Sequence, residues 1–415
     1  MIESSELSIP PADAEDRLLA GLRVLDFTQY LAGPVCTRLL AEMGAEVIKV
    51  EMPPYGDPQR GSSPRASKRS GSFLQQNRGK RSFCVNFATD AGRSLVESLV
   101  PHVDVVVENF SPGVMARRSL DYESLKRIHP GIIMASITGF GQTGKLATKP
   151  AFDSVVQAFS GLMHMTGEPD GPPLLAGLPV ADTSAGVHAF AAIGYALFSR
   201  TLTGQGCHID IALLDSVFHL HEIPIFAGSM DPDYVATRTG QHYATQSPAG
   251  AFRSPDGWIV VFCTQEQIAR LWQAMDRPDL ADDERLASPG GRITHRQLLT
   301  DEIELWMQSF PSDAAVLATL DLHRVPSSQV IDPSRAKEYE HYRDRGLVQT
   351  VHDPLVGEIN VPGFPLRFSN WPTGVSFETR TVGQDNAYVL STLLGLDPAR
   401  VAELEHEGVI ASRSS

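Results

Sequence analysis

The sequence contains few cysteines, and they follow no recognisable pattern. Four occur in 415 residues, at Cys36, Cys84, Cys207 and Cys263, and no two of them have the CxxC spacing. This argues against a disulfide framework and a cysteine-based zinc site, so we expect a reducing compartment and no bound metal. The sequence also lacks a basic N-terminal stretch and any apolar run of about 18 residues. These absences predict a cytoplasmic protein without a membrane partner.

Basic residues are in the minority, with 35 Lys and Arg against 49 Asp and Glu, a formal net charge of −14. Non-specific nucleic-acid binding requires a basic footprint, so no nucleic-acid partner is expected. Anionic small molecules can still bind where cations are concentrated. Two such places are NRGKRS, with Arg78, Lys80 and Arg81, and the adjacent pair Arg117 and Arg118.

The order of apolar runs predicts an α/β fold with a parallel sheet. Strands are expected at Leu22–Thr28 and Ala45–Glu51, with a helix over Val35–Met43 between them and Pro34 at its first position. A strand, a helix and a strand within about 30 residues form a βαβ unit. Further strands are expected at 82–87, 103–108 and 131–138.

A dinucleotide fingerprint is missing where a nicotinamide-dependent oxidoreductase would need it. The first βα turn reads QYLAGP rather than GxGxxG. Residues 139–144 do match GxGxxG, but the following Lys145–Pro150 predicts no helix whose N-terminus could hold a pyrophosphate. Both observations argue against that class of enzyme.

The segment from Pro150 to Gly204 is the most informative part of the chain. Asp182 stands immediately before a predicted helix, Thr183–Arg200, whose Ala, Gly and apolar residues predict burial on nearly every side. An aspartate there is a common N-cap, and it is also a candidate nucleophile. Asp153, earlier in the segment, is either the N-cap of a helix over Ser154–Met163 or an acidic active-site residue.

Changes in composition predict the domain organisation. We expect an N-terminal arm over residues 1–20, a large domain over 21–223 and a smaller domain over 224–330, where apolar runs are shorter. Residues 53–76, rich in Pro, Gly, Ser and Arg, predict a surface loop. The C-terminal part predicts a β-ribbon around DPLVGEINVPGFPLRFS and a helix over Asn386–Leu394.

Seven segments occur in the order that is typical of one family: VLDFTQYLAGPVCTRLLAEMGAEVIKVE, NRGKRS, VVVENFSPGVMARRSL, SITGFGQTG, PAFDSVVQAFSGLMHMTG, ADTSAG and TGQGCHIDIALLDSV. On these segments the chain resembles the class III CoA-transferases, also called the CaiB/BaiF family, over about its whole length beyond the arm. The resemblance implies a Rossmann-like large domain built from both chain ends, so that 331–415 is a C-terminal return to the large domain begun by 21–223, with 224–330 inserted between. It also implies a homodimer of two interlocked, ring-like subunits.

The resemblance implies that Asp182 is the nucleophile of a CoA-transferase. Its substrates would be an acyl-CoA and a carboxylic acid, with a coenzyme A thioester as substrate and no permanently bound cofactor. An aspartate is ordinarily ionised at neutral pH, and a helix N-terminus favours its anionic form, so no general base is expected.

The resemblance also implies a set of binding residues. The expected contacts to CoA and its acyl group are Gln29, Tyr30, Leu31, Arg81, Val85, Asn109, Phe110, Arg117 and Arg118, and the expected substrate-pocket residues are Phe152 and Asp153. Two departures from the family's pattern matter. Some members carry Gln at the position of Leu31, and formyl-CoA transferases carry a glycine run where residues 241–252 have only Gly250, which disfavours a formyl/oxalate substrate pair.

Two other functions stay open. An α-methylacyl-CoA racemase of the same family would carry His where this chain has Phe152, which favours a transferase. A non-catalytic CoA-binding protein is the other alternative. The acids also stay open: dicarboxylic, branched, aromatic and carnitine-like acceptors are candidates, with succinyl-CoA or acetyl-CoA as donor.

Overall fold

The computed structural model describes residues 16–374 and 378–413, so most of the expected N-terminal arm lies outside the described residues. The described residues form two compact units. The larger comprises the described residues of 1–162, 176–225 and 340–415, and the smaller comprises 163–175 and 226–339. The sequence placed 163–175 in the large domain, whereas these residues group with the smaller unit.

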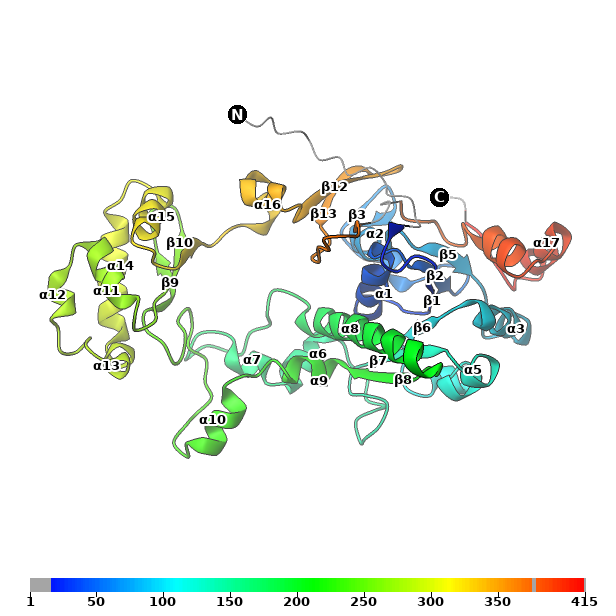
Figure 1. Cartoon of the computed structure of the whole chain (residues 1–415), viewed down its shortest axis with the longest axis horizontal. Helices are drawn as coiled ribbons and strands as arrows, with labels where there is room; N and C mark the ends of the chain where they lie inside the picture. The colour runs from blue at the N-terminus through cyan, green and yellow to red at the C-terminus, as the bar shows by residue number, and fades with distance from the viewer. Residues whose placement is uncertain (1–15, 375–377, 414–415) are drawn as a thin grey trace. The chain divides into compact units, whose positions relative to one another are not determined.

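A six-stranded parallel sheet forms the centre of the larger unit (Figure 1). In spatial order its strands are β5 (Arg81–Cys84), β2 (Glu46–Glu51), β1 (Arg23–Asp26), β6 (Val105–Glu108), β7 (Ile133–Thr138) and β8 (His208–Ala212). Numbered in chain order among themselves, they run 3-2-1-4-5-6, the order of doubly wound nucleotide-binding folds. The predicted parallel α/β sheet is confirmed.

Both faces of the sheet are buried, as the apolar strands require. Successive residues such as Val24 and Leu25 belong to the two separate cores on opposite faces. One face is covered by α1 (Ala32–Glu42), α6 (Asp153–Phe159), α8 (Val180–Thr203) and α9 (Leu213–Phe218). The other face is covered by α3 (Asp90–Leu99), α5 (Tyr122–Ile128), a π-helix (Tyr388–Leu393) and α17 (Pro398–His406).

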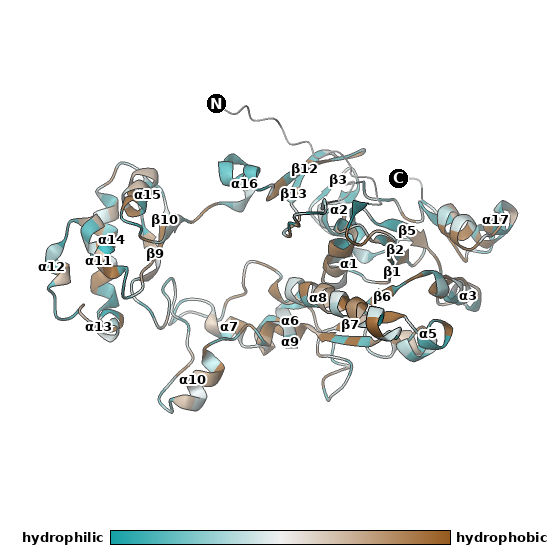
Figure 2. Cartoon of the chain, in the orientation of Figure 1, coloured by the Kyte–Doolittle hydropathy of each residue, from teal (hydrophilic) through white to brown (hydrophobic). Residues whose placement is uncertain are grey.

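Helix α8 is buried along one side only, which corrects the prediction of burial on nearly every side. Small residues form its buried stripe, and a Cβ added to Gly186 would lie 2.6 Å from the carbonyl oxygen of Ala32, so α1 and α8 approach closely. On the opposite side Tyr195, Phe198 and Leu202 are 78%, 63% and 72% exposed. Figure 2 shows apolar residues along the length of α8. The sequence of α8 is apolar on all sides of the helix, but residues of the same chain cover only one side.

The C-terminal residues complete the β5 edge of the sheet. The Ser82 N–H donates to Asp385 and the Cys84 N–H to Asn386, and Val85 pairs with Ile410 in an isolated bridge. The expected β-ribbon is present as β12 (Val348–Asp353) and β13 (Gly357–Pro362). The expected helix over 386–394 includes the π-helix, whereas α17 was not predicted.

Residues 53–76 are more regular than the predicted surface loop. They contain a 3-10 turn η2 (Pro58–Gly61), a hairpin of β3 (Arg65–Ala66) and β4 (Arg69–Ser70), and the start of α2 (Gly71–Asn77). Ser70 caps α2 by accepting the Phe73 N–H. Polar and glycine-rich composition concealed a capped helix here, because capping residues and loop residues are the same types.

The smaller unit is built around a three-stranded antiparallel sheet with the order β11 (Ser327–Gln329), β10 (Trp258–Phe262) and β9 (Ala249–Arg253). Its helices are α11 (Ile268–Met275), α12 (Pro278–Ala281), α13 (Pro289–Thr294), α14 (Arg296–Gln308) and α15 (Asp313–Leu322). Its core is separate from the two cores of the large sheet and includes Trp272, Ile303 and Leu320. The remaining short helices of the two units are α4 (Val114–Arg117), α7 (Leu162–Met165), α10 (Pro224–Met230), α16 (Glu340–Asp344), η3 (Val100–His102) and η4 (Pro333–Glu338).

Candidate active site

A cavity of about 240 Å³ opens at the carboxyl ends of β1, β6 and β7. Its described lining residues are Tyr30, Leu31, Ala32, Asn109, Phe110, Ser111, Pro112, Ile137, Thr138, Gly139, Ala147, Lys149, Pro150, Ala151, Phe152, Asp182 and Leu213. β1 and β6 are the neighbours at which the strand order reverses. In open α/β sheets, ligands bind at that point outside the carboxyl ends of the strands.

Tyr30 is held in a left-handed backbone conformation at the rim of this cavity. Its φ is 62°, which is uncommon for a residue other than glycine. Its N–H donates to Oδ1 of Asp57 over 3.2 Å, and the other oxygen of Asp57 lies 3.0 Å from Nζ of buried Lys49. The ring of Tyr30 meets that of Phe152 edge to face, with 5.9 Å between the centroids. A buried ion pair therefore positions the side chain that forms one wall of the cavity.

Asn109 ties the β1 turn to the β6 turn. Its side-chain amide accepts the Gln29 N–H and donates to the Gln29 carbonyl, both over 2.8 Å. The preceding residue, Glu108, accepts the Phe110 N–H over 2.8 Å. Burial raises the pKa of Glu108 to about 7. Gln29 thus contributes its backbone N–H and carbonyl to the link between the two turns, and it does not line the cavity.

Asp182 is the third residue of α8, which begins at Val180, so the prediction that it precedes the helix is wrong by one turn. The side chain that satisfies the helix N-terminus is Asp153, whose Oδ1 accepts the N–H groups of Ala181 (2.7 Å) and Asp182 (3.2 Å). Asp153 is itself the first residue of α6, and Gln157 donates to its other oxygen. Asp153 therefore caps a different helix from the one expected and supports the backbone of Asp182.

Burial, and then the negative charge of Asp153, raise the pKa of Asp182 to about 7. This corrects the expectation that Asp182 is fully ionised at neutral pH. Within the described residues, no hydrogen bond or ion pair reaches the Asp182 carboxylate. Its position in the first turn of α8 favours the anion, but burial beside another carboxylate outweighs that effect.

The structure brings six of the expected site residues together around the cavity: Tyr30, Leu31, Asn109, Phe110, Phe152 and Asp182. Others lie outside its lining. Arg81 pairs with Glu46 and stacks on Tyr388, and Val85 is fully buried, so its side chain is not available to a ligand.

The two neighbouring arginines after β6 differ from each other. Arg117 is exposed and has no ion pair in the described part of the chain. The guanidinium of Arg118 lies 5.1 Å from the centre of the Phe87 ring. Contact of either with a nucleotide stays a prediction.

Two residues of the site were not predicted. Lys149 lines the cavity and is its only cation among the described lining residues; its Nζ lies 5.5 Å from the Phe159 ring centre. Asp57 supports Tyr30 from a distant loop. The pattern KPAFD placed Lys149 near Phe152 in sequence, whereas nothing in the sequence links Asp57 to Tyr30.

No group of three or more His, Cys, Asp or Glu in metal-binding proximity occurs among residues 16–374 and 378–413. No helix in the same residues is long and apolar enough to cross a membrane.

Comparison with known proteins identifies the family. The sequence profile described as CoA-transferase family III matches residues 19–386. The chain is 36% identical to the succinyl-CoA–D-citramalate CoA-transferase of Chloroflexus aurantiacus, over 97% of this chain and 99% of the relative. It is 34% identical to the human succinyl-CoA:glutarate CoA-transferase, over 94% of this chain and 90% of the relative.

A solved structure shows the same fold. The crystal structure of a CaiB/BaiF family protein from Brucella suis matches with a TM-score of 0.81 and 32% identity, covering 91% of this chain and all of that one. The profile, the relatives and the fold agree with the motifs in the sequence, and the chain belongs to CoA-transferase family III, the CaiB/BaiF family, and is an enzyme of that type.

Proposed function

We propose that this enzyme transfers CoA from an acyl-CoA to a carboxylic acid through covalent intermediates on Asp182. The observation that supports this most strongly is the position of Asp182. Its carboxylate has no partner in the described chain and lines a cavity at the point where the strand order reverses. A carboxylate so placed is free to attack a bound thioester.

The chemistry balances without a proton transfer. An Asp182 oxygen attacks the thioester carbonyl carbon, and the C–S bond breaks. CoA departs as the thiolate, and a mixed anhydride remains on Asp182. The thiolate then attacks the Asp182 carbonyl carbon and releases the first acid, which leaves an aspartyl-CoA thioester. The acceptor carboxylate attacks this thioester, the C–S bond breaks, and a second mixed anhydride forms as the thiolate leaves. The thiolate attacks the acceptor's carbonyl carbon in this anhydride, the C–O bond to Asp182 breaks, and the new acyl-CoA and the Asp182 carboxylate are released.

The surroundings of Asp182 suit such intermediates. Ala32, Gly139 and Ala151 line the cavity together with Asp182, so small side chains leave space for an acyl group. The raised pKa of Asp182 reports weak solvation, and a poorly solvated carboxylate is a better nucleophile once ionised. For the CoA nucleotide, exposed Arg117 is the favoured phosphate contact because its guanidinium makes bidentate bonds.

We propose succinyl-CoA as donor and a short dicarboxylate as acceptor. Relatives at 33–38% identity are named for succinyl-CoA with D-citramalate, glutarate or mesaconate. In this chain, Lys149 supplies a cation for the second carboxylate of such an acid, while Tyr30 and Phe152 supply an apolar wall. Those features also fit acids larger than formate.

We further propose that the active enzyme is a homodimer, in which a second copy covers the exposed side of α8. Tyr195, Phe198 and Leu202 form an apolar face there, and clustered exposed apolar residues mark interaction sites. The interlocked arrangement implied by the family resemblance would bury such a helix.

Trapping tests the covalent mechanism. After incubation with succinyl-CoA, intact-mass spectrometry should show protein carrying one CoA, and hydroxylamine should convert Asp182 to a hydroxamate. Asp182→Asn should abolish both signals and reduce turnover by several orders of magnitude. Asp215→Asn, which alters an exposed aspartate in α9, is the control and should keep both. Undiminished turnover in Asp182→Asn would exclude the mechanism.

Lys149→Met tests the acceptor class. With saturating succinyl-CoA, kcat/KM for glutarate should fall about tenfold or more, the usual cost of losing a bond to a charged group, while kcat/KM for valerate stays constant. Lys145→Met, in the same loop but outside the cavity lining, is the matched control. An equal fall in kcat/KM for both acids would contradict this, because Lys149 would then contact a part of the substrate that both acids share.

The pH profile tests the environment of Asp182. Since the nucleophile must be ionised and its pKa is about 7, kcat/KM should rise with pH through about 7. Asp153→Asn removes a negative charge but keeps an acceptor oxygen for the α8 backbone, so the rise should move to lower pH. A rise centred below about pH 5, or one that Asp153→Asn leaves in place, would contradict this.

Light scattering with gel filtration tests the dimer. The native chain should elute with twice its mass of 45.1 kDa. Phe198→Asp with Leu202→Asp should yield monomers, because two charges would have to be buried. Leu322→Asp, at an equally exposed apolar residue of the smaller unit, should remain dimeric. A monomeric native chain would disprove the proposal.

A further inference from the structure

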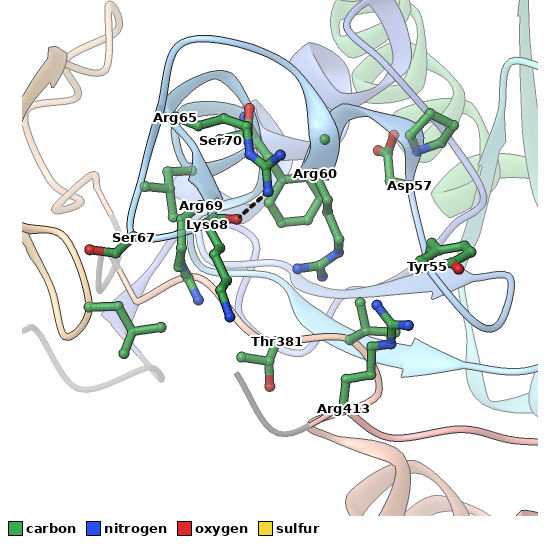
Figure 3. A pocket seen from close by; sticks show the side chains of 16 residues that line it. Tyr55, Asp57, Arg60, Arg65, Ser67, Lys68, Arg69, Ser70, Thr381 and Arg413 are labelled. Atoms are coloured by element: carbon green, nitrogen blue, oxygen red, sulfur yellow. Dashed lines mark hydrogen bonds between the residues drawn. The ribbon is translucent and has the colours of Figure 1, made fainter.

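A second cavity, of about 470 Å³, lies in the larger unit near the β3–β4 hairpin. Its volume falls in the range of small-molecule sites. Among the described residues, it shares none of its lining with the cavity at Asp182. Figure 3 shows the ends of Arg60, Lys68, Arg69 and Arg413 turned toward this space from different segments of the chain.

The charges around the cavity do not cancel. Arg60 is paired with Glu51, Arg69 with Asp353, and Asp57, the only carboxylate among the described lining residues, with Lys49. In the described part of the chain, the Arg65 side chain donates only to the Lys68 carbonyl. Within the described residues, the side chains of Lys68 and Arg413 have no acidic partner. In a chain of net charge −14, this leaves an uncompensated concentration of positive charge.

The backbone of Lys68 is strained. Ser67 and Lys68 occupy the two central positions of the β3–β4 turn with φ of 47° and 63°. Both positions of such a turn usually carry Asn or Gly, because other residues adopt this conformation at a cost. The turn directs the Lys68 ammonium into the cavity (Figure 3). A strained residue that presents a charge to a cavity is typical of a ligand site.

The remaining walls are apolar. Phe73, Leu74, Leu355 and Val382 line the cavity, and the guanidinium of Arg413 lies 4.6 Å from the Tyr55 ring centre. Inorganic ions alone would leave this apolar surface uncovered. The shape and charge together match a molecule with an anionic head and an apolar body.

We propose that this cavity binds a small organic anion, a carboxylate or phosphate ester with an apolar body, at a site separate from Asp182. Lys68 and Arg413 provide the charges that receive the anionic head. Arg60 and Arg69, already neutralised, provide further N–H donors. This proposal does not depend on the transfer mechanism.

Titration calorimetry of the full chain with phenyl phosphate, and separately with benzoate, tests the proposal. One saturable site per chain is expected, and the tighter of the two probes identifies the head group as phosphate or carboxylate. Arg413→Ser should weaken binding about tenfold or more. Lys145→Ser removes one exposed cation elsewhere and should leave the affinity within about twofold.

Lys68→Gly separates a role of Lys68 in ligand binding from a role in stabilising the fold. Glycine accepts the left-handed turn, so this variant should unfold at a higher temperature and yet bind the probe more weakly. Absence of saturable binding, or unchanged affinity in both Lys68→Gly and Arg413→Ser, would overturn the proposal. Displacement of phenyl phosphate by CoA would overturn the separateness of the site.

Discussion

Two buried lysines hold together the edge of the sheet at which the cavity lined by Asp182 forms. Nζ of Lys80 lies 3.0 Å from Asp26 and 2.7 Å from Oγ1 of Thr37, while Lys49 bonds to Asp57 and to the Thr28 carbonyl. Burying such charges is costly, and losing one partner would leave the other uncompensated. The network therefore fixes the β1–α1 turn in one geometry, from which Tyr30 projects into the cavity.

Aspartates on the same side of the sheet show how partners decide the charge state of a buried carboxyl. Burial alone would raise the pKa of Asp26, but Lys80, Lys49 and two hydroxyl donors hold it at about 2. Asp182 is partly buried, and the charge that acts on it is the carboxylate of Asp153, so its pKa rises to about 7. The first aspartate is a permanent structural anion, whereas the second can take up a proton near neutral pH.

The sequence predicted the parts of the fold that depend on local pattern. Apolar runs such as VVVE revealed the strands, and the motif around Asp182 revealed the residue at the cavity. The sequence did not predict contacts between distant segments: Asp57 supports Tyr30, and Asp153 caps α8 rather than its own helix. The exposed side of α8 was also mispredicted, because apolar composition does not reveal whether the covering surface belongs to the same chain.

The dependence of β5 on residues 385–411 has a consequence for synthesis of the protein. On the ribosome, the first five strands of the large sheet are complete long before Asp385 and Asn386 emerge, and the whole smaller unit is made in between. During that interval the outer edge of β5 lacks its native partners. An open strand edge invites pairing with other chains, so nascent large units need protection until the last residues arrive. Residues 385–411 thus complete the edge of a sheet whose strands were made much earlier in the chain.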